Sequence, residues 1–438
     1  MIRTMRALHV LALALAAVGG GVILTAHTDP EGPGRAGADS ARVATLLTAL
    51  AHTDPVICDL IGDQLGNFWT GNNPVGRFSD APAVQGAKDS LAGYITDPRA
   101  VSLLVATLGT DNPCVRRVAA KLLGQSAVSA DVLGRLFDNA SPRIREGAAY
   151  AAGVRGRRET RGALERQLTD TATGPAAMAA WALGEIQDPA SAPALQASVH
   201  ATSSRVRLAS AWALGQFEDA SYAKDVLPLL RDVDPVMRAT AAEALGRMKS
   251  PRVGAALVGA LTDRNDAVRR AAVSALADME ERSAAAPIEG LLLNDPDADV
   301  RRECADALGN FSLGRSLEPL ARALGDQDVE VQRQAANAIG DLNDVTKAPA
   351  ALIRATTSQD LELRRHATRA LAHIGDVATV PALVDRLGDE DKDVRLAAVE
   401  GLGEMNVTAA LPGLTRALND RDPEVRRAAA EALGKTQE

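Results

Sequence analysis

The sequence predicts an all-α protein, a right-handed α-solenoid of about twelve two-helix repeats with a period of about 31 residues. Strings related to RDPEVRRAAAEALGK (residues 421–435) recur along the chain. An Arg stands at the same place in nine of eleven consecutive strings, at spacings of 29–32 residues, and a Gly follows eight residues later in nine of eleven. Self-similarity at a fixed period of this length is typical of stacked repeats.

Positions within each repeat are numbered from this Arg, which we call slot 0. In two repeats slot 0 is occupied by Ala176 and Gln332 instead of Arg. The nine arginines at slot 0 are Arg116, Arg145, Arg207, Arg238, Arg269, Arg301, Arg364, Arg395 and Arg426.

The final repeat shows how one unit is expected to fold. Asp422 is a natural N-cap, and Pro423 suits the first helical position because its missing N–H would have no partner there. Apolar residues follow at helical spacing, and Gly434, at slot +8, is expected to end the helix in the left-handed conformation. A second apolar run precedes the next N-cap, as in residues 380–387. Each unit is therefore predicted to be two antiparallel helices of about three turns.

The N-terminal residues predict export. Arg3 and Arg6 precede twenty uncharged residues, 7–26, a pattern typical of a signal peptide and also long enough for an uncleaved membrane anchor. The predicted location is the periplasm or the extracellular face of a bacterial cell envelope, with the membrane contacted only through such an anchor. The predicted segments are a signal peptide or anchor (1–26), a flexible linker (27–41), a degenerate capping repeat with an insertion (42–80) and the solenoid (81–438).

Export makes the three cysteines relevant, because an oxidising compartment permits disulfides. Cys304 occupies an Ala slot of the predicted core and is expected to be a buried, inert thiol. Cys58 and Cys114 are candidates for a disulfide, which requires the insertion at residues 67–82 to let the chain double back, because Cα atoms two repeats apart exceed the limit of about 7 Å. The alternative is that both thiols are inert.

Composition narrows the class of partner. Since 46% of the residues are hydrophobic but only 3% are aromatic, Ala and Leu carry the predicted burial. The formal net charge of −8 argues against nucleic-acid binding, which needs many Lys and Arg side chains facing phosphate. No phosphate-binding loop, nucleophile elbow or Cys-x-x-Cys motif occurs. We expect no cofactor and no nucleic-acid partner, and we expect a monomer.

The pattern VRRAAAEALG (residues 425–434) resembles the HEAT repeats, specifically the short HEAT-like type named after phycobilin lyases, over about residues 81–438. This resemblance implies a stacked α-solenoid that mostly holds other proteins, with the slot 0 arginines and a set of aspartates forming a ladder along the stack. Ala176 and Gln332 depart from the pattern, which leaves the continuity of the ladder open at those two steps. The matching aspartates, six residues before slot 0, are Asp232, Asp263, Asp295, Asp326, Asp389 and Asp420.

Enzymes with HEAT-like folds define the alternatives. The di-iron hydroxylases of this class use paired His-Glu dipeptides, which this sequence lacks, and His366 and His373 have no third ligand at metal spacing. We therefore predict no metal site, no catalytic residues and a non-catalytic scaffold of the cell envelope that binds a protein partner. The alternatives are a bilin lyase-like or di-iron hydroxylase-like enzyme, and a regulatory array related to a membrane sensor or peptidase.

One stretch is a candidate for partner binding. Slot +5 is polar or charged in most repeats, which marks it as an outward position, but it is Tyr150, Trp181 and Trp212 in three successive repeats. Stacking would place these rings in a row about 10 Å apart, and Trp, Tyr and Arg together have hot-spot composition. The alternative is that the rings pack into the groove between repeats. The arginines of the adjacent basic run are Arg155, Arg157, Arg158 and Arg161.

Overall fold

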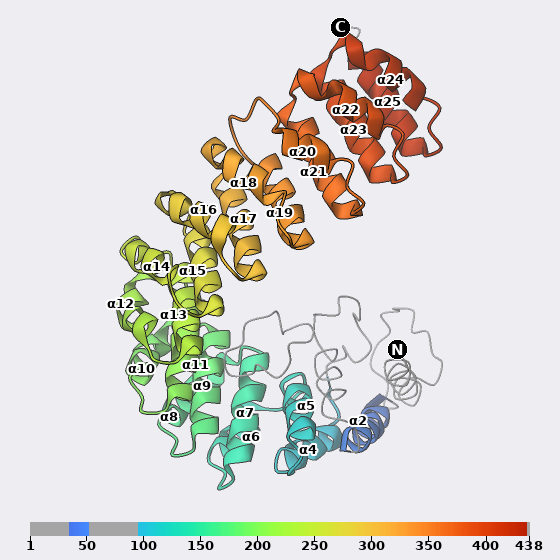
Figure 1. Cartoon of the computed structure of the whole chain (residues 1–438). Coiled ribbons are helices and arrows are strands. Elements are labelled where there is room, and N and C mark those ends of the chain that lie inside the picture. Colours follow the sequence, from blue (N-terminus) through green and yellow to red (C-terminus); the bar gives the residue numbers. More distant parts are fainter. Residues whose placement is uncertain (1–34, 52–94, 436–438) are drawn as a thin grey trace. The chain divides into compact units, whose positions relative to one another are not determined.

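The computed structural model describes residues 35–51 and 95–435, and within them the only β pairing is an isolated bridge between Ile95 and Ser126. The protein is the predicted all-α solenoid: long and short helices alternate along the chain, and within each unit every long helix packs on the next (Figure 1). Two compact units divide the chain between Val226 and Leu227.

Unit 1 opens with α2 (Arg35–Ala51), which packs on α4 and α5 ahead of the regular repeats. Its long helices are α5 (Pro113–Gly124), α7 (Pro142–Val154), α9 (Thr173–Ile186) and α11 (Ser204–Gln216). Its short helices are α4 (Pro98–Thr107), α6 (Ala130–Phe137), α8 (Arg161–Gln167), α10 (Ala192–Ser198) and α12 (Ala223–Val226).

Unit 2 opens with the 3-10 helix η4 (Leu227–Arg231). Its long helices are α13 (Pro235–Met248), α15 (Asp266–Asp278), α17 (Ala298–Phe311), α19 (Val329–Gly340), α21 (Leu361–Ile374), α23 (Lys392–Met405) and α25 (Pro423–Lys435). Its short helices are α14 (Gly254–Ala260), α16 (Ala285–Asn294), α18 (Leu317–Ala323), α20 (Ala350–Ala355), α22 (Val380–Arg386) and α24 (Leu411–Ala417).

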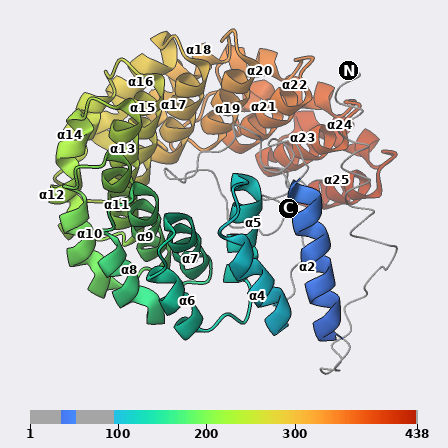
Figure 2. The ribbon, with the colours of Figure 1, turned by 90° about the horizontal axis from the view of Figure 1, so that it is seen from below.

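Within each unit the helices form two layers. The long helices line the inner side of the curve and the short helices form the outer layer (Figure 2). The core lies between them, and in α15 the side chains of Val268, Ala272 and Leu276 are fully buried. Alanine at slot +3, which is Ala272 in α15, lets neighbouring helices approach closely.

The second helices are shorter than the three turns predicted. They have 4–10 residues, and most begin after a three-residue 3-10 helix such as η7 (Val377–Thr379) ahead of α22. Pro381, the second residue of α22, lacks an amide hydrogen and is tolerated only in the first turn of a helix. The proline therefore fixes where the α-helical part begins.

The predicted N-caps are confirmed. The side chain of Asp422 accepts a hydrogen bond from the N–H of Glu424 at 2.9 Å, and Pro423 is the first residue of α25. Asp391 caps α23 in the same way, accepting from two N–H groups of the first turn. These contacts satisfy donors that would otherwise have no partner in the helix.

The slot +8 glycines do not end the helices in the left-handed conformation, contrary to the prediction for Gly434. Gly124 and Gly340 are the last residues of α5 and α19, and the others lie inside the long helices, where they allow the next repeat to approach. A Cβ on Gly246 would lie 2.7 Å from the Cα of Ala275, and a Cβ on Gly184 would lie 2.8 Å from the Cα of Ala213. Because these neighbours are backbone atoms of the next long helix, a side chain at slot +8 would push the two repeats apart.

The left-handed residue that follows most of the long helices comes three positions later, at slot +11, and is mostly not glycine; after α19 it is Asp344, at slot +12. The φ angle is 51° at Gln187, 53° at Glu280 and 46° at Asn406, whereas Gly375 has φ 67° at the same slot. A side chain in this region costs on the order of 1 kcal/mol. The packing of the flanking helices therefore imposes the conformation on residues that do not favour it.

Glu280→Gly is expected to raise the free energy of unfolding of unit 2 by roughly 0.5–1 kcal/mol, because glycine adopts positive φ without a Cβ clash. Glu280 is exposed, so the substitution removes no buried contact. Urea unfolding followed by circular dichroism measures the change. Gly375→Ala is the matched reverse variant and should lose stability; a loss in Glu280→Gly as well would contradict the explanation.

The predicted Asp–Arg ladder is present and joins neighbouring repeats. Nε and Nη2 of Arg238 donate to the two carboxylate oxygens of Asp263 at 2.7 and 2.8 Å, and Nη1 donates to the backbone carbonyl of Asp232 in its own repeat. The Asp263 carboxylate also accepts from the N–H of Asn265, which shapes the loop before the next helix. One guanidinium therefore holds two successive loops together. The other bidentate pairs are Arg145–Asp170, Arg269–Asp295, Arg301–Asp326 and Arg395–Asp420.

The remaining slot 0 arginines are Arg116, Arg207, Arg364 and Arg426. Arg364 lies 3.4 Å from Asp389 and 3.1 Å from Glu390. Donation to two carbonyl oxygens of the arginine's own loop is shared by Arg116, Arg145, Arg207, Arg238, Arg364, Arg395 and Arg426.

The two departures from the ladder have different outcomes. Ala176 offers no donor, so it supplies no rung. At Gln332 the rung moves by one residue, and Arg333 at slot +1 donates to both oxygens of Asp360, at 2.8 and 2.5 Å. Asp360 is the N-cap of α21, so this carboxylate both caps a helix and links two repeats. Arg365 and Asp391 form the same arrangement one repeat later.

These slot +1 pairs predict a loss of stability in acid. Arg333 holds the pKa of Asp360 at about 2, and Arg365 holds the pKa of Asp391 at about 2, both below the ordinary 3.8. Because the folded-state pKa is depressed, the stabilisation is fully present above about pH 4 and is lost as pH falls toward 2. The double variant Asp360→Asn/Asp391→Asn keeps both caps but not the charge. We expect it to have a lower urea midpoint than the parent at pH 5 and a smaller further drop at pH 3.

Asp234→Asn is the control for this test, because Asp234 caps α13 and forms no ion pair with a described residue. Its urea midpoint should fall with pH as steeply as that of the parent protein. An equally steep fall in the double variant would rule out the two pairs as its cause.

The N-terminal helix corrects the predicted linker. α2 begins at Arg35, inside the segment 27–41 that the sequence predicts as flexible. Pro33 is the last proline before it, and the Ala- and Leu-rich residues that follow favour a helix. The predicted signal or anchor (1–26) lies outside the described residues, as does much of the predicted capping repeat. Among the helices described, none combines the length and apolar character needed to cross a bilayer.

Candidate partner-binding surface

The aromatic row predicted as a binding surface is buried. Tyr150 and Trp181 are each 5% exposed and Trp212 is 8% exposed. The rings of Tyr150 and Trp181 stack with centroids 5.1 Å apart and an interplanar angle of 15°. The prediction that slot +5 turns these rings outward is therefore wrong, and the alternative, packing between repeats, is confirmed.

The slot +8 glycines explain this burial. A Cβ on Gly153 would lie 2.6 Å from a ring carbon of Trp181, and one on Gly184 would lie 2.8 Å from a ring carbon of Trp212. Each indole thus covers the glycine of the preceding repeat, where any other residue would collide with it. The rings contribute to stacking through buried apolar area.

The basic run beside the aromatic row splits into two kinds of residue. Arg157 donates to the carbonyl of Ser126 in the preceding repeat at 3.1 Å, and Arg161 lies 3.3 Å from Asp188 in the next short-helix segment. These two arginines link repeats. Arg155 and Arg158 are exposed at the end of α7 and the start of η1 (Arg158–Thr160). The run and the rings therefore do not form one exposed patch.

The exposed side chains of the inner layer in unit 2 recur at slots +5 and +9 of the long helices. Asp306, Asn337 and Glu400 at slot +5 are exposed, as the polar pattern predicts. In unit 1 the rule fails at Lys121, which is 3% exposed. The two slots lie one helical turn apart, so together they form a strip along the inner face of unit 2, which we call the inner strip.

The inner strip is acidic. Between α13 and α23 its only cations besides histidine are Arg247 and Arg369, which face six carboxylates. These belong to Glu243, Asp278, Asp306, Asp341, Glu400 and Glu404.

Two contacts hold the centre of the strip in place: Gln334 donates to Asp306 across the repeat boundary at 2.6 Å, and Asn310 donates to the same carboxylate at 3.2 Å. Burial raises the pKa of Asp278 and of nearby Glu303. A cationic group brought to this strip would relieve like-charge repulsion.

The other end of the inner face is charge-balanced. At slots −2 and +1, Asp299 pairs with Arg302 at 3.2 Å and Glu362 pairs with Arg365 at 2.9 Å along the same helices. These pairs bring arginines to the carboxylates at this end, and Arg365 also pairs with Asp391 and Asp393. Slots +5 and +9, in contrast, have fewer arginines than carboxylates.

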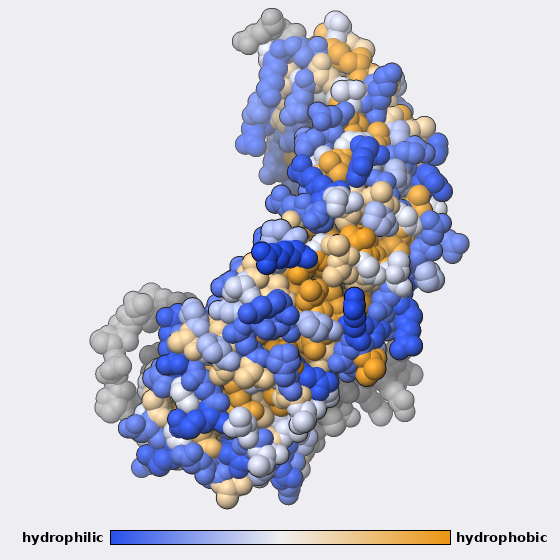
Figure 3. Space-filling model, turned by 90° about the vertical axis from the view of Figure 1, so that its left-hand side faces the viewer, coloured by the Kyte–Doolittle hydropathy of each residue, from blue (hydrophilic) through white to orange (hydrophobic). Residues whose placement is uncertain are grey.

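The outer face over α14 and α16 has a different character. α14 has no charged residue, and α16 has one, Glu289. Figure 3, which views the protein from the side of these helices, shows apolar side chains gathered between hydrophilic ones. The two faces of unit 2 therefore differ in what they offer a partner.

The described residues hold no cluster of three or more His, Cys, Asp and Glu side chains placed for a metal ion. His366 is half-buried and His373 exposed, and burial lowers the pKa of His366. Cys304 is a free, fully buried thiol whose pKa is raised by burial, which confirms the core position predicted for it. Cys114 is half-buried near the start of α5, and Cys58 lies outside the described residues, so their bond stays a prediction.

Comparison with known proteins supports the same architecture. No curated protein matches the sequence. Importin β has a similar structure, with a TM-score of 0.55 and 14% identity over 77% of this chain and 57% of that chain. A structure reporting the binding of Kap95p to RanGDP has a TM-score of 0.50 and 15% identity, over 97% of this chain and 60% of that chain. This chain thus spans less than two thirds of either protein.

A further match is the CpcE–CpcF complex of a phycocyanin lyase from Nostoc, with a TM-score of 0.34 and 21% identity over 56% of this chain and 93% of that chain. The sequence profile of the HEAT repeats matches in overlapping segments that together cover residues 129–438. These segments include the long helices α7 to α25 with their slot 0 and slot +8 residues. The chain belongs to the HEAT-repeat family.

Proposed function

We propose that this protein is a non-catalytic scaffold of the cell envelope that holds a protein partner along the inner strip of unit 2. The HEAT solenoid is a fold suited to protein interaction, since stacking produces a long continuous surface. The observation that carries the proposal is the recurrence of exposed acidic and polar side chains at slots +5 and +9 of successive long helices.

The chemistry of this strip defines the expected partner. Six carboxylates against two arginines favour a segment rich in Lys or Arg, and such attraction raises the association rate and weakens with salt. Kap95p is a solenoid of similar fold whose reported structure concerns binding to another protein, RanGDP. The envelope location is supported by the basic and apolar residues at positions 1–26.

Affinity isolation of the full chain from the envelope fraction tests the proposal. We expect a protein partner in fixed stoichiometry, released by raised salt and lost in Glu400→Lys/Glu404→Lys, which reverses two charges on the inner strip. Asp131→Lys, an exposed acid on the outer helix α6, is the control and should retain the partner. Bound iron or a bilin chromophore in the purified protein, seen by metal analysis or absorbance, would contradict a non-catalytic scaffold.

A further inference from the structure

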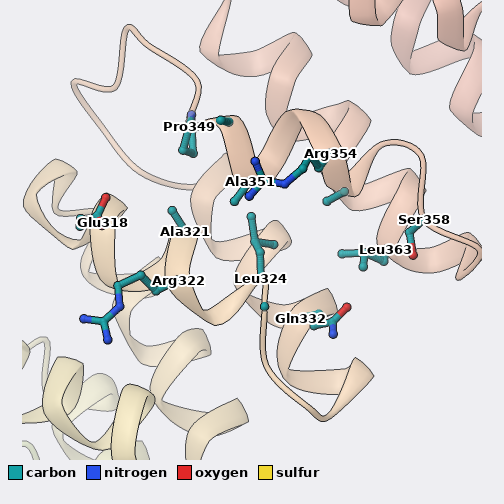
Figure 4. Close-up of a pocket in the computed structure, with 13 residues that line it drawn as sticks. Glu318, Ala321, Arg322, Leu324, Gln332, Pro349, Ala351, Arg354, Ser358 and Leu363 are labelled. Carbon is teal, nitrogen blue, oxygen red and sulfur yellow. The ribbon is translucent and has the colours of Figure 1, made fainter.

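A cavity of about 620 Å³ opens in the outer layer of unit 2, between the short helices α18 and α20 (Figure 4). Its volume is within the range of roughly 300–1,000 Å³ found for small-ligand sites. Leu324, Leu363 and several alanines supply apolar surface, and Gln332 and Ser358 lie at the end nearest the long helices. The cavity is separate from the inner strip, which lies on the other layer.

The cavity lies where the repeat departs from its own pattern. Gln332 replaces the slot 0 Arg, and Ser358 stands where a ladder Asp would be, six residues before Arg364. The short helix is also changed: no 3-10 turn precedes α20, which has only six residues. The link between these two repeats passes instead through Arg333 and Asp360. The outer side of the junction between these two repeats is therefore open.

Two cations at this cavity form no side-chain hydrogen bond or ion pair with the described residues. Arg322 of α18 and Arg354 of α20 are exposed and donate to no described residue. Arg322 and Arg354 both stand ten residues before slot 0. In the next repeat this slot is Asp385, and the residue after it, Arg386, reaches back to the carbonyl of Thr356 at 3.0 Å and lies 3.5 Å from Asp389. In Figure 4 the side chain of Arg354 lies over the cavity beside Ala351.

The remaining polar groups define the ligand. The hydroxyl of Ser358 accepts from the N–H of Asp360 and keeps its own hydrogen to donate. Glu318, also at the cavity, is the one carboxylate there and can accept a peptide N–H. The Arg354 guanidinium and the Ser358 hydroxyl beside an apolar floor match a carboxylate attached close to an apolar group, whereas the Arg322 guanidinium points away from Leu324 in Figure 4.

In an extended peptide, successive side chains point to opposite sides, so an acidic side chain and its apolar neighbour cannot enter one cavity together. The last residue of a polypeptide carries a carboxylate and a side chain on the same Cα. We propose that the cavity between α18 and α20 binds the C-terminal residue of a partner polypeptide, with the carboxylate at Arg354 and an apolar side chain on Leu324 and Leu363.

Fluorescence anisotropy with the full chain tests this inference. The probes are labelled hexapeptides ending in Ala, Val, Leu or Phe, each with a free or an amidated C-terminus. At least one free-acid peptide should bind, and amidation or Arg354→Gln should each weaken it at least about tenfold, as expected for a lost charge-assisted hydrogen bond. Arg416→Gln removes an equivalent exposed arginine from α24, whose side chain donates to Pro412 of its own helix and to no other described residue, and should leave the affinity unchanged.

Other outcomes overturn the inference. Binding of none of the free-acid peptides, or equal binding of acids and amides, would exclude capture of a C-terminus. A preference for an amidated peptide with an internal Glu would assign the cations to an acidic side chain instead. Glu400→Lys/Glu404→Lys should not alter peptide binding, so this test and the test of the inner strip can fail independently.

Discussion

Arg269→Met is expected to destabilise the repeats around α15 and α17 by about 3–5 kcal/mol, because it strands a buried carboxylate. Asp295 has a side chain that is 1% exposed, and Arg269 donates to both of its oxygens at 2.7 and 2.8 Å. Hydrogen exchange should show the loss as faster exchange in α15 and α17, with a smaller effect far along the stack, since each repeat contacts only its neighbours.

The adjacent arginine provides the control. Arg270 lies 3.7 Å from Asp299, and both side chains are well exposed, so Arg270→Met should change stability by at most about 1 kcal/mol. The double variant Arg269→Met/Asp295→Leu should recover much of the loss, because neither charge remains buried. Equal effects of Arg269→Met and Arg270→Met would show that the buried ladder has no special role in stacking.

Gly246→Ala and Gly434→Ala are expected to have effects of opposite sign, although both add one methyl group at slot +8. At Gly246 the methyl meets the Cα and Cβ of Ala275 at 2.7 Å, and relieving this overlap costs roughly 1–3 kcal/mol. At Gly434 the methyl meets nothing within 4 Å, and Ala is favoured over Gly in a helix by up to about 1 kcal/mol. Urea midpoints of the two variants measure the difference.

This pair separates two explanations of the glycines. If they served to end the helices, both substitutions would destabilise the protein. A gain of stability at Gly246 would show instead that the repeats have room for a side chain, which would contradict the close approach of neighbouring long helices.

Much of the fold can be predicted from the sequence because the same residue types recur at the same slots in many repeats. Asp or Asn before the helix predicts the cap, and the slot 0 Arg with its partner Asp predicts the ladder that Arg238 and Asp263 form. Contacts within one repeat, and between equivalent positions, follow from the period. The missing ladder pair at Gln332 is also visible in the sequence. The Arg333–Asp360 pair that takes its place is not, because that pairing depends on a shift of one residue between helices.

The errors concern side chains whose surroundings come from the next repeat. A slot +8 glycine fits both a helix end and a close approach, and only the position of the neighbouring helix decides between them. The same holds for Trp181, which shares slot +5 with exposed residues such as Asn337 but finds space over Gly153. The sequence does not mark the left-handed conformation at Gln187 and Glu280, which have no preference for it, although Gly375 and Asn406 at the same slot do favour it.

The signals for the candidate binding surfaces are weaker but present. The polar residues at slot +5 indicate the inner strip. The acidic residues at slot +9 could be assigned to it only when the structure placed both slots on the same face. The cavity beside Arg354 is marked by Gln332 and Ser358, where both members of a ladder pair are replaced.

Photo-cross-linking in native cells tests most directly whether the inner strip holds a protein partner. A photoreactive amino acid is placed at Asn337 or Glu400 on the inner strip, and at Ala286 on the outer helix α16 as an exposed control. The two inner positions should capture the same protein, and Ala286 should not capture it. Cross-links to that protein from Ala286 alone, or none from either inner position, would contradict the account.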